Sequence, residues 1–66
     1  NEVRFITQES YSNMIISDVQ GRIVKMRYGL NAGTHQTNVG DLPSGVYLLR
    51  LSSDGIIRQS KLVIQH

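Results

Sequence analysis

The 66-residue sequence has no cysteine, no tryptophan and only one proline. The lack of cysteine excludes disulfide bonds and thiolate metal sites, so the fold must be stabilised by packing or by association with a neighbour. Long hydrophobic runs are also missing, because no apolar stretch approaches the roughly 18 residues that a membrane-spanning helix requires. We therefore predict one small packed domain without membrane insertion.

Charge of one sign is not in large excess. Seven basic residues oppose five acidic ones, and so mild an imbalance does not by itself indicate binding to nucleic acid or anionic lipid. Four basic side chains and two aromatic ones could form a nucleic-acid surface: Arg22, Lys25, Arg27, Arg58, Phe5 and Tyr11. Because charged residues that alternate with aliphatic ones usually form the solvated face of a strand, we predict no nucleic-acid partner.

Sequence motifs for catalysis and metal binding are also missing. Ser44 precedes a glycine, but no Gly-x-Ser-x-Gly elbow surrounds it, so we interpret it as a turn residue. His35 and His66 lack the spacing of metal ligands. Three aspartates lie beside glycine-containing turns, where a carboxylate usually accepts hydrogen bonds from the turn backbone: Asp18, Asp41 and Asp54. The sequence therefore predicts a domain that is not an enzyme and that has no metal site or cofactor.

Short apolar stretches separated by Gly, Asn, Asp or Pro recur along the chain, which is typical of an all-β sandwich or barrel. The glycines leave no uninterrupted window with helical periodicity. The six predicted strands are residues 2–7, 11–17, 22–28, 35–39, 46–52 and 56–64. We therefore predict an all-β fold, a small immunoglobulin-like antiparallel β-sandwich with about six to seven strands.

Side-chain alternation assigns the faces of these strands, because successive residues of a strand point to opposite sides of the sheet. In the third segment, the residues predicted to face the core are Val24, Met26 and Tyr28, and those predicted to face mostly water are Ile23, Lys25 and Arg27. The other predicted core residues are Met14, Ile16, Tyr47, Leu49, Leu51, Leu62 and Ile64.

Three turns can be predicted from glycine and proline. Residues 18–21 fit a type I turn with Gly21 in the left-handed region, and residues 54–55 are an Asp-Gly pair, which favours a two-residue type I′ turn. Residues 41–45 contain Pro43, whose φ is fixed near −65°, and Gly45, which we predict to adopt a positive φ. This third turn leads into the predicted strand that carries Tyr47.

Residues 42–47 resemble the Leu-Pro-x-Gly-x-Tyr signature of type A C-terminal sorting domains, which are carried by cargo of the type IX (Por) secretion system of Bacteroidota. Three further motifs follow the order found in that family. They are a strand ending in Asp18 with Gly-Arg after it (residues 14–25), a Leu-x-x-Gly turn with a polar strand (30–39), and a final Lys-aliphatic strand (61–65). Four motifs in one order are more specific than any one of them alone.

The family usually opens with an aromatic residue followed by Pro-Asn-Pro, and residues 1–4 show nothing of this kind. The chain also begins with Asn1 instead of Met and has no signal-peptide pattern. We therefore expect residues 1–66 to be a sorting domain that lacks this opening and to be a piece of a longer product.

The resemblance implies a non-catalytic secretion signal that directs an N-terminal cargo across the outer membrane and is often removed during cell-surface anchoring. The implied partners are the outer-membrane type IX translocon and a sortase-like peptidase. The implied localisation is secreted or cell surface, reached via the periplasm and the outer membrane. The residues expected to take part in partner recognition are Pro43, Gly45, Tyr47, Lys61, Leu62, Val63 and Ile64.

The residues alone leave other interpretations open. The terminal strand could be an ordinary core strand, or a receptor could recognise it by strand addition or by capture of its carboxylate. An immunoglobulin-like adhesion or carbohydrate-binding module at the cell surface is the alternative function, and a hydrolase fragment ranks below both. Position discriminates the first two, because a sorting signal must be the C-terminus of its precursor, whereas an adhesion module can occur anywhere.

Overall fold

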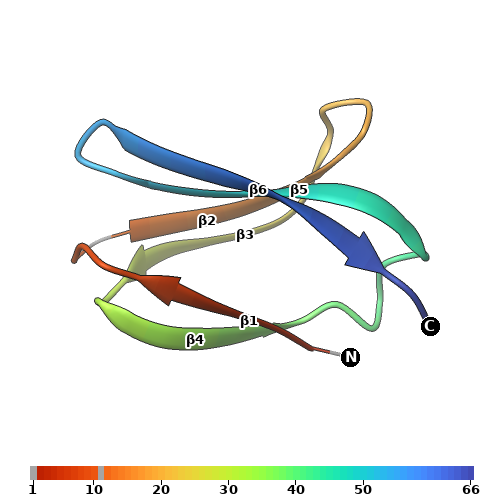
Figure 1. Ribbon diagram of the computed structural model, residues 1–66, viewed down its shortest axis with the longest axis horizontal. Coiled ribbons are helices and arrows are strands. Elements are labelled where there is room, and N and C mark those ends of the chain that lie inside the picture. Colours follow the sequence, from red (N-terminus) through yellow and green to blue (C-terminus); the bar gives the residue numbers. More distant parts are fainter. Residues whose placement is uncertain (1, 11) are drawn as a thin grey trace.

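The computed structural model describes residues 2–10 and 12–66, which form six strands and no helix. Figure 1 labels the strands β1 (Glu2–Thr7), β2 (Ser12–Asp18), β3 (Ile23–Leu30), β4 (Gly33–Asn38), β5 (Gly45–Ser53) and β6 (Ile56–Ile64). No segment of the described chain is a helix that could span a membrane. β1 and β6 coincide with the predicted segments, and the other strands begin and end within one or two residues of the prediction. The predicted start at Tyr11 lies outside the described residues.

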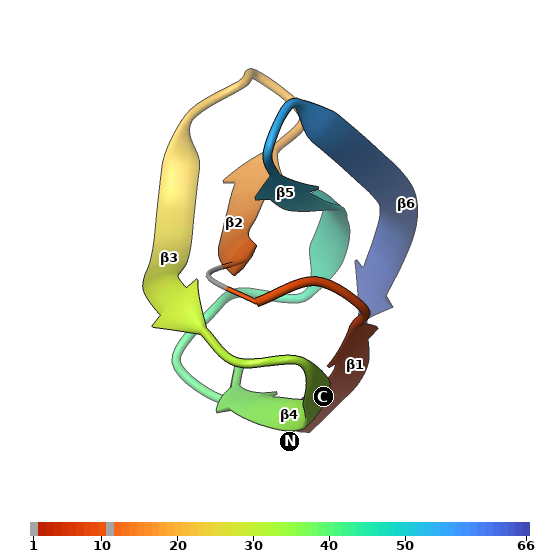
Figure 2. The ribbon, with the colours of Figure 1, turned by 90° about the vertical axis from the view of Figure 1, so that its left-hand side faces the viewer.

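The strands form two antiparallel sheets. The larger sheet has the order β3-β2-β5-β6, and the smaller one pairs β1 with β4. Figure 2 shows β1 and β4 together beneath the larger sheet. The antiparallel β-sandwich predicted from strand alternation and turn spacing is confirmed.

Two tight hairpins set the neighbours in the larger sheet. Gly21 has a φ of 86° and donates its N–H to the Asp18 carbonyl oxygen at 3.0 Å, which closes the β2–β3 hairpin as predicted. The Asp18 carboxylate accepts two more hydrogen bonds from backbone amides of the same turn. Asp54 and Gly55 have φ values of 50° and 80°, the two positive values that a type I′ turn requires between β5 and β6.

The core lies between the two sheets and is centred on β2. Met14 and Ile16 are both 0% exposed. The other buried apolar residues are Phe5, Leu30, Val39, Leu42, Tyr47, Leu49 and Ile64, and Leu51 and Leu62 are partly buried against them. The core residues predicted on β2, β5 and β6 are therefore confirmed.

The predicted inner face of β3 is wrong. Met26 and Tyr28 are 42% and 64% exposed, although alternation placed both in the core. Lys25 and Arg27 pair with the two fully buried residues of β2, so the basic residues share the inner face of the sheet. The cause is an irregularity in the β2–β3 register at Val24, which packs against the core and reverses the alternation that follows.

Lys25 and Arg27 occupy this inner face because they lie on an edge strand and reach across to the other sheet. Lys25 Nζ donates to the Asn38 carbonyl oxygen at 2.6 Å and to Asp41 Oδ1 at 3.0 Å. Arg27 Nη1 donates to the Gln36 carbonyl oxygen at 2.8 Å. The aliphatic stems of such side chains cover apolar surface while their charged ends reach polar groups. The two residues therefore join β3 to β4 without a backbone ladder.

Candidate recognition site

The structure places the two predicted recognition segments side by side. Pairing of β5 with β6 sets Gly45 opposite Ile64, Val46 opposite Val63, Tyr47 opposite Leu62 and Leu48 opposite Lys61. Residues far apart in the sequence thus form one continuous part of the sheet, next to the turn that contains Pro43. We call its exposed residues the turn–strand surface: Pro43, Gly45, Val46, Lys61 and Val63.

Tyr47 holds the turn from the core side. Its ring is buried, with 6% of the residue exposed, and its hydroxyl donates a 2.6 Å hydrogen bond to the Pro43 carbonyl oxygen. Leu42 is also buried, and its N–H donates to the Val39 carbonyl oxygen at 3.0 Å. A side-chain hydrogen bond and a buried leucine therefore fix the conformation of the turn before any partner binds.

The predicted positive φ of Gly45 is wrong, because the glycines with positive φ are others. Gly45 is the first residue of β5 and pairs with Ile64, so its backbone is that of a strand. A Cβ built on Gly45 would meet the nearest Tyr47 ring atom at 3.8 Å, an ordinary van der Waals contact. Neither backbone conformation nor packing within the domain requires glycine here.

His66 also contacts the turn, and sequence reasoning missed it. Its backbone N–H donates to Ser44 Oγ at 3.2 Å, and its Nε2 lies 2.7 Å from the Leu42 carbonyl oxygen. Ser44 is thus a turn residue, as predicted, which also receives the end of the chain. One signal for this contact was available. His66 lies just after β6, and the end of β6 pairs with the start of β5.

Burial divides the seven predicted recognition residues into two groups. Tyr47 and Ile64 are buried and Leu62 is half-buried, so these side chains build the core. The remaining four are exposed: Pro43, Gly45, Lys61 and Val63. A partner can contact the second group directly, whereas the first group supports it.

An ion pair between Lys25 and Asp41 lies at the start of the same turn. The Lys25 ammonium donates to the Asp41 carboxylate and, together with the backbone N–H of Asp41, lowers the pKa of that carboxyl below its ordinary value of 3.8. The Lys25 side chain is 21% exposed and the Asp41 side chain 69% exposed. The ion pair therefore lies at the surface and links the turn to β3.

The described residues considered for nucleic-acid binding form contacts with other residues of the domain. Phe5 is buried and stacks on His35 with ring centroids 5.6 Å apart. Arg22 pairs with Asp18 at 2.9 Å. Tyr11 lies outside the described residues. The four basic side chains thus each form a hydrogen bond or ion pair with another residue of the domain.

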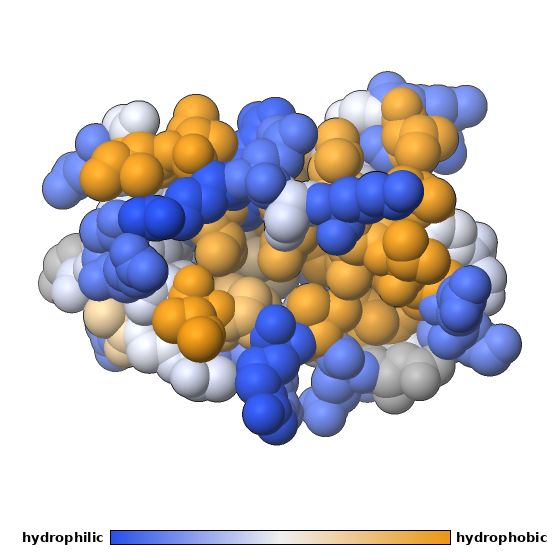
Figure 3. Space-filling model, viewed as in Figure 1, coloured by the Kyte–Doolittle hydropathy of each residue, from blue (hydrophilic) through white to orange (hydrophobic). Residues whose placement is uncertain are grey.

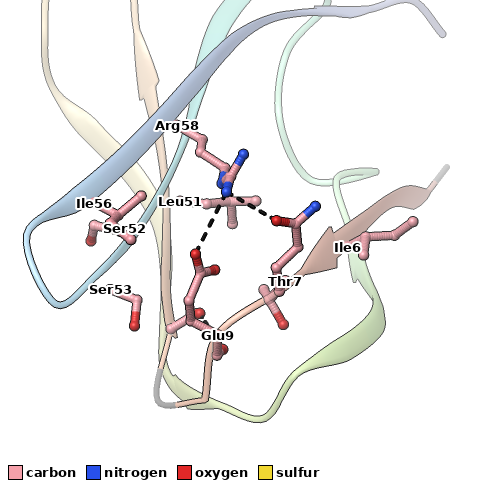
Figure 4. Close-up of a pocket in the computed structure, with 10 residues that line it drawn as sticks. Ile6, Thr7, Glu9, Leu51, Ser52, Ser53, Ile56 and Arg58 are labelled. Atoms are coloured by element: carbon pink, nitrogen blue, oxygen red, sulfur yellow. Dashed lines mark hydrogen bonds and ion pairs between the residues drawn. The ribbon is translucent and has the colours of Figure 1, made fainter.

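Arg58 closes a small cavity at the far end of β6. Its Nη2 lies 3.0 Å from Gln8 Oε1 and 3.6 Å from Glu9 Oε1, as the dashed lines in Figure 4 mark. The cavity beneath has a volume of about 10 Å³, which is room for about one water molecule. Within residues 2–10 and 12–66, no three His, Cys, Asp or Glu residues come together in a way that could hold a metal ion.

These features define the class of this domain: a small β-sandwich whose braced turn and terminal strand form one exposed surface. Residues 1–65 match the family model described as the secretion system C-terminal sorting domain. The chain belongs to this family, as the resemblance predicted. No curated protein matches the chain. Membership establishes a type IX sorting-signal role, an interaction with the secretion machinery, and export of the protein that carries the domain.

Proposed function

We propose that the domain is a non-catalytic signal, and that the type IX translocon at the outer membrane binds it through the turn–strand surface. The cargo passes through the periplasm with the folded domain attached and then crosses the outer membrane. A sortase-like peptidase removes the domain when the cargo is anchored at the cell surface.

The observation that carries this proposal is the pairing of residues 45–48 with residues 61–64. Two motifs that are distant in the sequence but typical of the family form a single surface. A partner that contacts both motifs must therefore bind the folded domain. Tyr47 and His66 both form hydrogen bonds with the turn. A preorganised surface binds with less loss of conformational entropy than a flexible segment does.

Gly45 supports direct contact at this surface. Its place in the family signature has no explanation in the backbone conformation or packing of the domain. A glycine on a strand often marks a site where another backbone approaches closely. We therefore assign Gly45 to close approach by the backbone of the partner at the start of β5.

Secretion of a fluorescent reporter fused in front of residues 1–66 tests the proposal. The fusion is expressed in type IX-competent cells and in the same cells with the translocon disabled, and reporter outside the cells is measured. We expect export only in competent cells. A second fusion also carries the precursor's own residues upstream of residue 1. It keeps the test valid if export requires the Pro-Asn-Pro opening of the family. Retention of both fusions in the periplasm of competent cells would overturn the proposal, and export from both strains would overturn the role of the translocon.

A further inference from the structure

The free edge of β6 differs from the other sheet edges that the structure describes. At the free edge of β4, the carbonyl oxygens of Gln36 and Asn38 accept hydrogen bonds from side chains of β3. β3 is interrupted by two shifts of register with β2, and such bulges make an edge a poor template for strand addition. β6 has nine residues, no proline and an unbroken register with β5.

Apolar side chains line part of the space beside this edge. Figure 3 shows hydrophobic surface between the strands that Figure 1 labels β6 and β1. At the C-terminal end of β6 lies a groove of about 150 Å³, lined by the aliphatic residues Val3, Val39, Val63 and Ile64 and by the polar residues Glu2 and Gln65. The sandwich is therefore open on this side, where an additional strand would cover apolar atoms.

The backbone groups that face this space can be assigned from the hairpin. Ser53 and Ile56 flank a two-residue turn and so form a hydrogen-bonded pair, and hydrogen-bonded pairs recur at every second residue. The even-numbered residues of β6 therefore bond to β5. Residues 57, 59, 61 and 63 direct their N–H and C=O groups to the free edge.

We propose that the occupant of this edge is β6 of a second copy of the chain, paired antiparallel about a two-fold axis at Ser60. In this register Ile57 lies opposite Val63 of the second copy, and Gln59 lies opposite its Lys61. Residues 57, 59, 61 and 63 exchange hydrogen bonds across the axis, as their backbone orientation requires. Each contact occurs twice, because a two-fold interface is the same on both subunits.

Side-chain chemistry selects this register. Ile57 and Val63 are 62% and 53% exposed and share the outer face, so pairing them covers two apolar side chains at each end of the interface. A shift that centres the axis on residue 61 would set Lys61 against itself, and one that centres it on residue 58 would do the same for Arg58. Like charges directly opposite each other destabilise strand pairs.

The same register also fills the groove. Ile56 of the second copy lies opposite Ile64 on the inner face, so its side chain meets the apolar lining that Val3 and Val39 provide. Ile56 is 46% exposed in the single chain. Self-pairing of β1 would give a shorter interface, because β1 has six residues and β6 has nine.

Cysteine cross-linking of the 66-residue chain tests both the interface and its register. The chain has no cysteine, so a Ser60→Cys variant carries a single thiol, which the register places about 4.5 Å, Cα to Cα, from its counterpart. That separation suits a disulfide, whereas Gln59→Cys thiols would be offset by two residues, beyond the limit of about 7 Å. We expect Ser60→Cys to form a covalent dimer on mild oxidation and Gln59→Cys to stay largely monomeric.

Sedimentation equilibrium of the unmodified chain gives the independent readout. We expect a concentration-dependent rise from the monomer mass of 7.4 kDa to twice that value. Gln59→Glu, which would face Lys61 of the second copy twice, should lower the dimer Kd by about fivefold. A monomer at every concentration, or faster cross-linking of Gln59→Cys than of Ser60→Cys, would overturn the proposal. These outcomes do not depend on whether the domain is recognised by the translocon.

Discussion

The Tyr47 hydroxyl donates a 2.6 Å hydrogen bond to the carbonyl oxygen of Pro43, four residues earlier in the chain. The contact couples the core to the turn, because the ring is buried between the sheets while Pro43 is exposed. It gives a physical reason for the spacing of proline and tyrosine in the motif. A phenylalanine could fill the same volume, but only the hydroxyl can hold the turn.

Replacing Tyr47 with Phe should therefore lower the free energy of unfolding by about 0.5–1.5 kcal/mol, the net value of a typical hydrogen bond. Urea unfolding of the two proteins measures the difference. Tyr28→Phe is the matched control, because Tyr28 is 64% exposed and its hydroxyl donates to the sulfur of the exposed Met26. Equal losses in the two variants would show that the Pro43 contact contributes no stability.

Ile64 and Val63 are neighbours on β6 that differ in burial, at 4% and 53% exposed. Ile64→Ala should cost about 2–5 kcal/mol, because it removes core contacts and leaves a cavity. In a domain this small, such a loss approaches the whole stability. Val63→Ala should change the unfolding free energy by no more than about 0.5 kcal/mol. Thermal unfolding followed by circular dichroism distinguishes them, and similar melting temperatures would contradict the assigned faces of β6.

Lys25 bridges the two sheets. Lys25→Met should lower the free energy of unfolding by about 0.5–1.5 kcal/mol, although the methionine side chain still covers the edge of the core. The reason is loss of the hydrogen bonds to the Asn38 carbonyl oxygen and the Asp41 carboxylate. Arg22→Met is the comparison, since the Arg22 side chain is 76% exposed and such surface pairs contribute little. The bridging role of Lys25 is refuted if chemical denaturation gives the same midpoint for both variants.

Acid should weaken the β2–β3 hairpin. Hydrogen bonds from the backbone N–H of Arg22, and then from its guanidinium and another turn amide, hold the pKa of Asp18 below its ordinary value of 3.8. A carboxyl whose pKa is lower in the folded state stabilises the fold above the unfolded pKa, and this contribution is lost as pH falls through the folded value. Stability should therefore decline below about pH 4, and Asp18→Asn should flatten part of that decline. The urea midpoints of the unmodified domain and of Asp18→Asn are measured from about pH 7 to pH 2.5. If the two midpoints fall in parallel with pH, the Asp18 carboxylate does not stabilise the hairpin in this way.

Local sequence patterns predicted most of the fold. Gly21 and the pair 54–55 allowed two hairpins to be predicted, because these turns require positive φ and the residues tolerate it, and both turns form as expected. Met26 was assigned to the wrong face because the alternation rule cannot detect a bulge, which depends on the register with a partner strand. Lys25 then occupies an inward position because an edge strand lets its charged end reach another sheet.

The organisation of the proposed recognition site could not be predicted from the sequence. The sequence pointed to residues 43–47 and 61–64 separately, and only the pairing of β5 with β6 joins them. The contacts of His66 with Leu42 and Ser44 link residues more than 20 positions apart, so no local pattern could indicate them. Gly45 was predicted to have a positive φ from its place in a turn, whereas pairing with Ile64 makes it a strand residue.

The central claim is that the turn–strand surface is what the secretion machinery reads, and a matched pair of exposed residues tests it most directly. Val63 and Ile6 are both exposed apolar strand residues, but Ile6 lies on β1, outside the turn–strand surface. Export of the reporter fusion is measured for Val63→Glu and Ile6→Glu, after urea unfolding has shown that both are folded. The account predicts about a tenfold or greater loss of export for Val63→Glu and near-normal export for Ile6→Glu. Equal export of the two folded variants would contradict it.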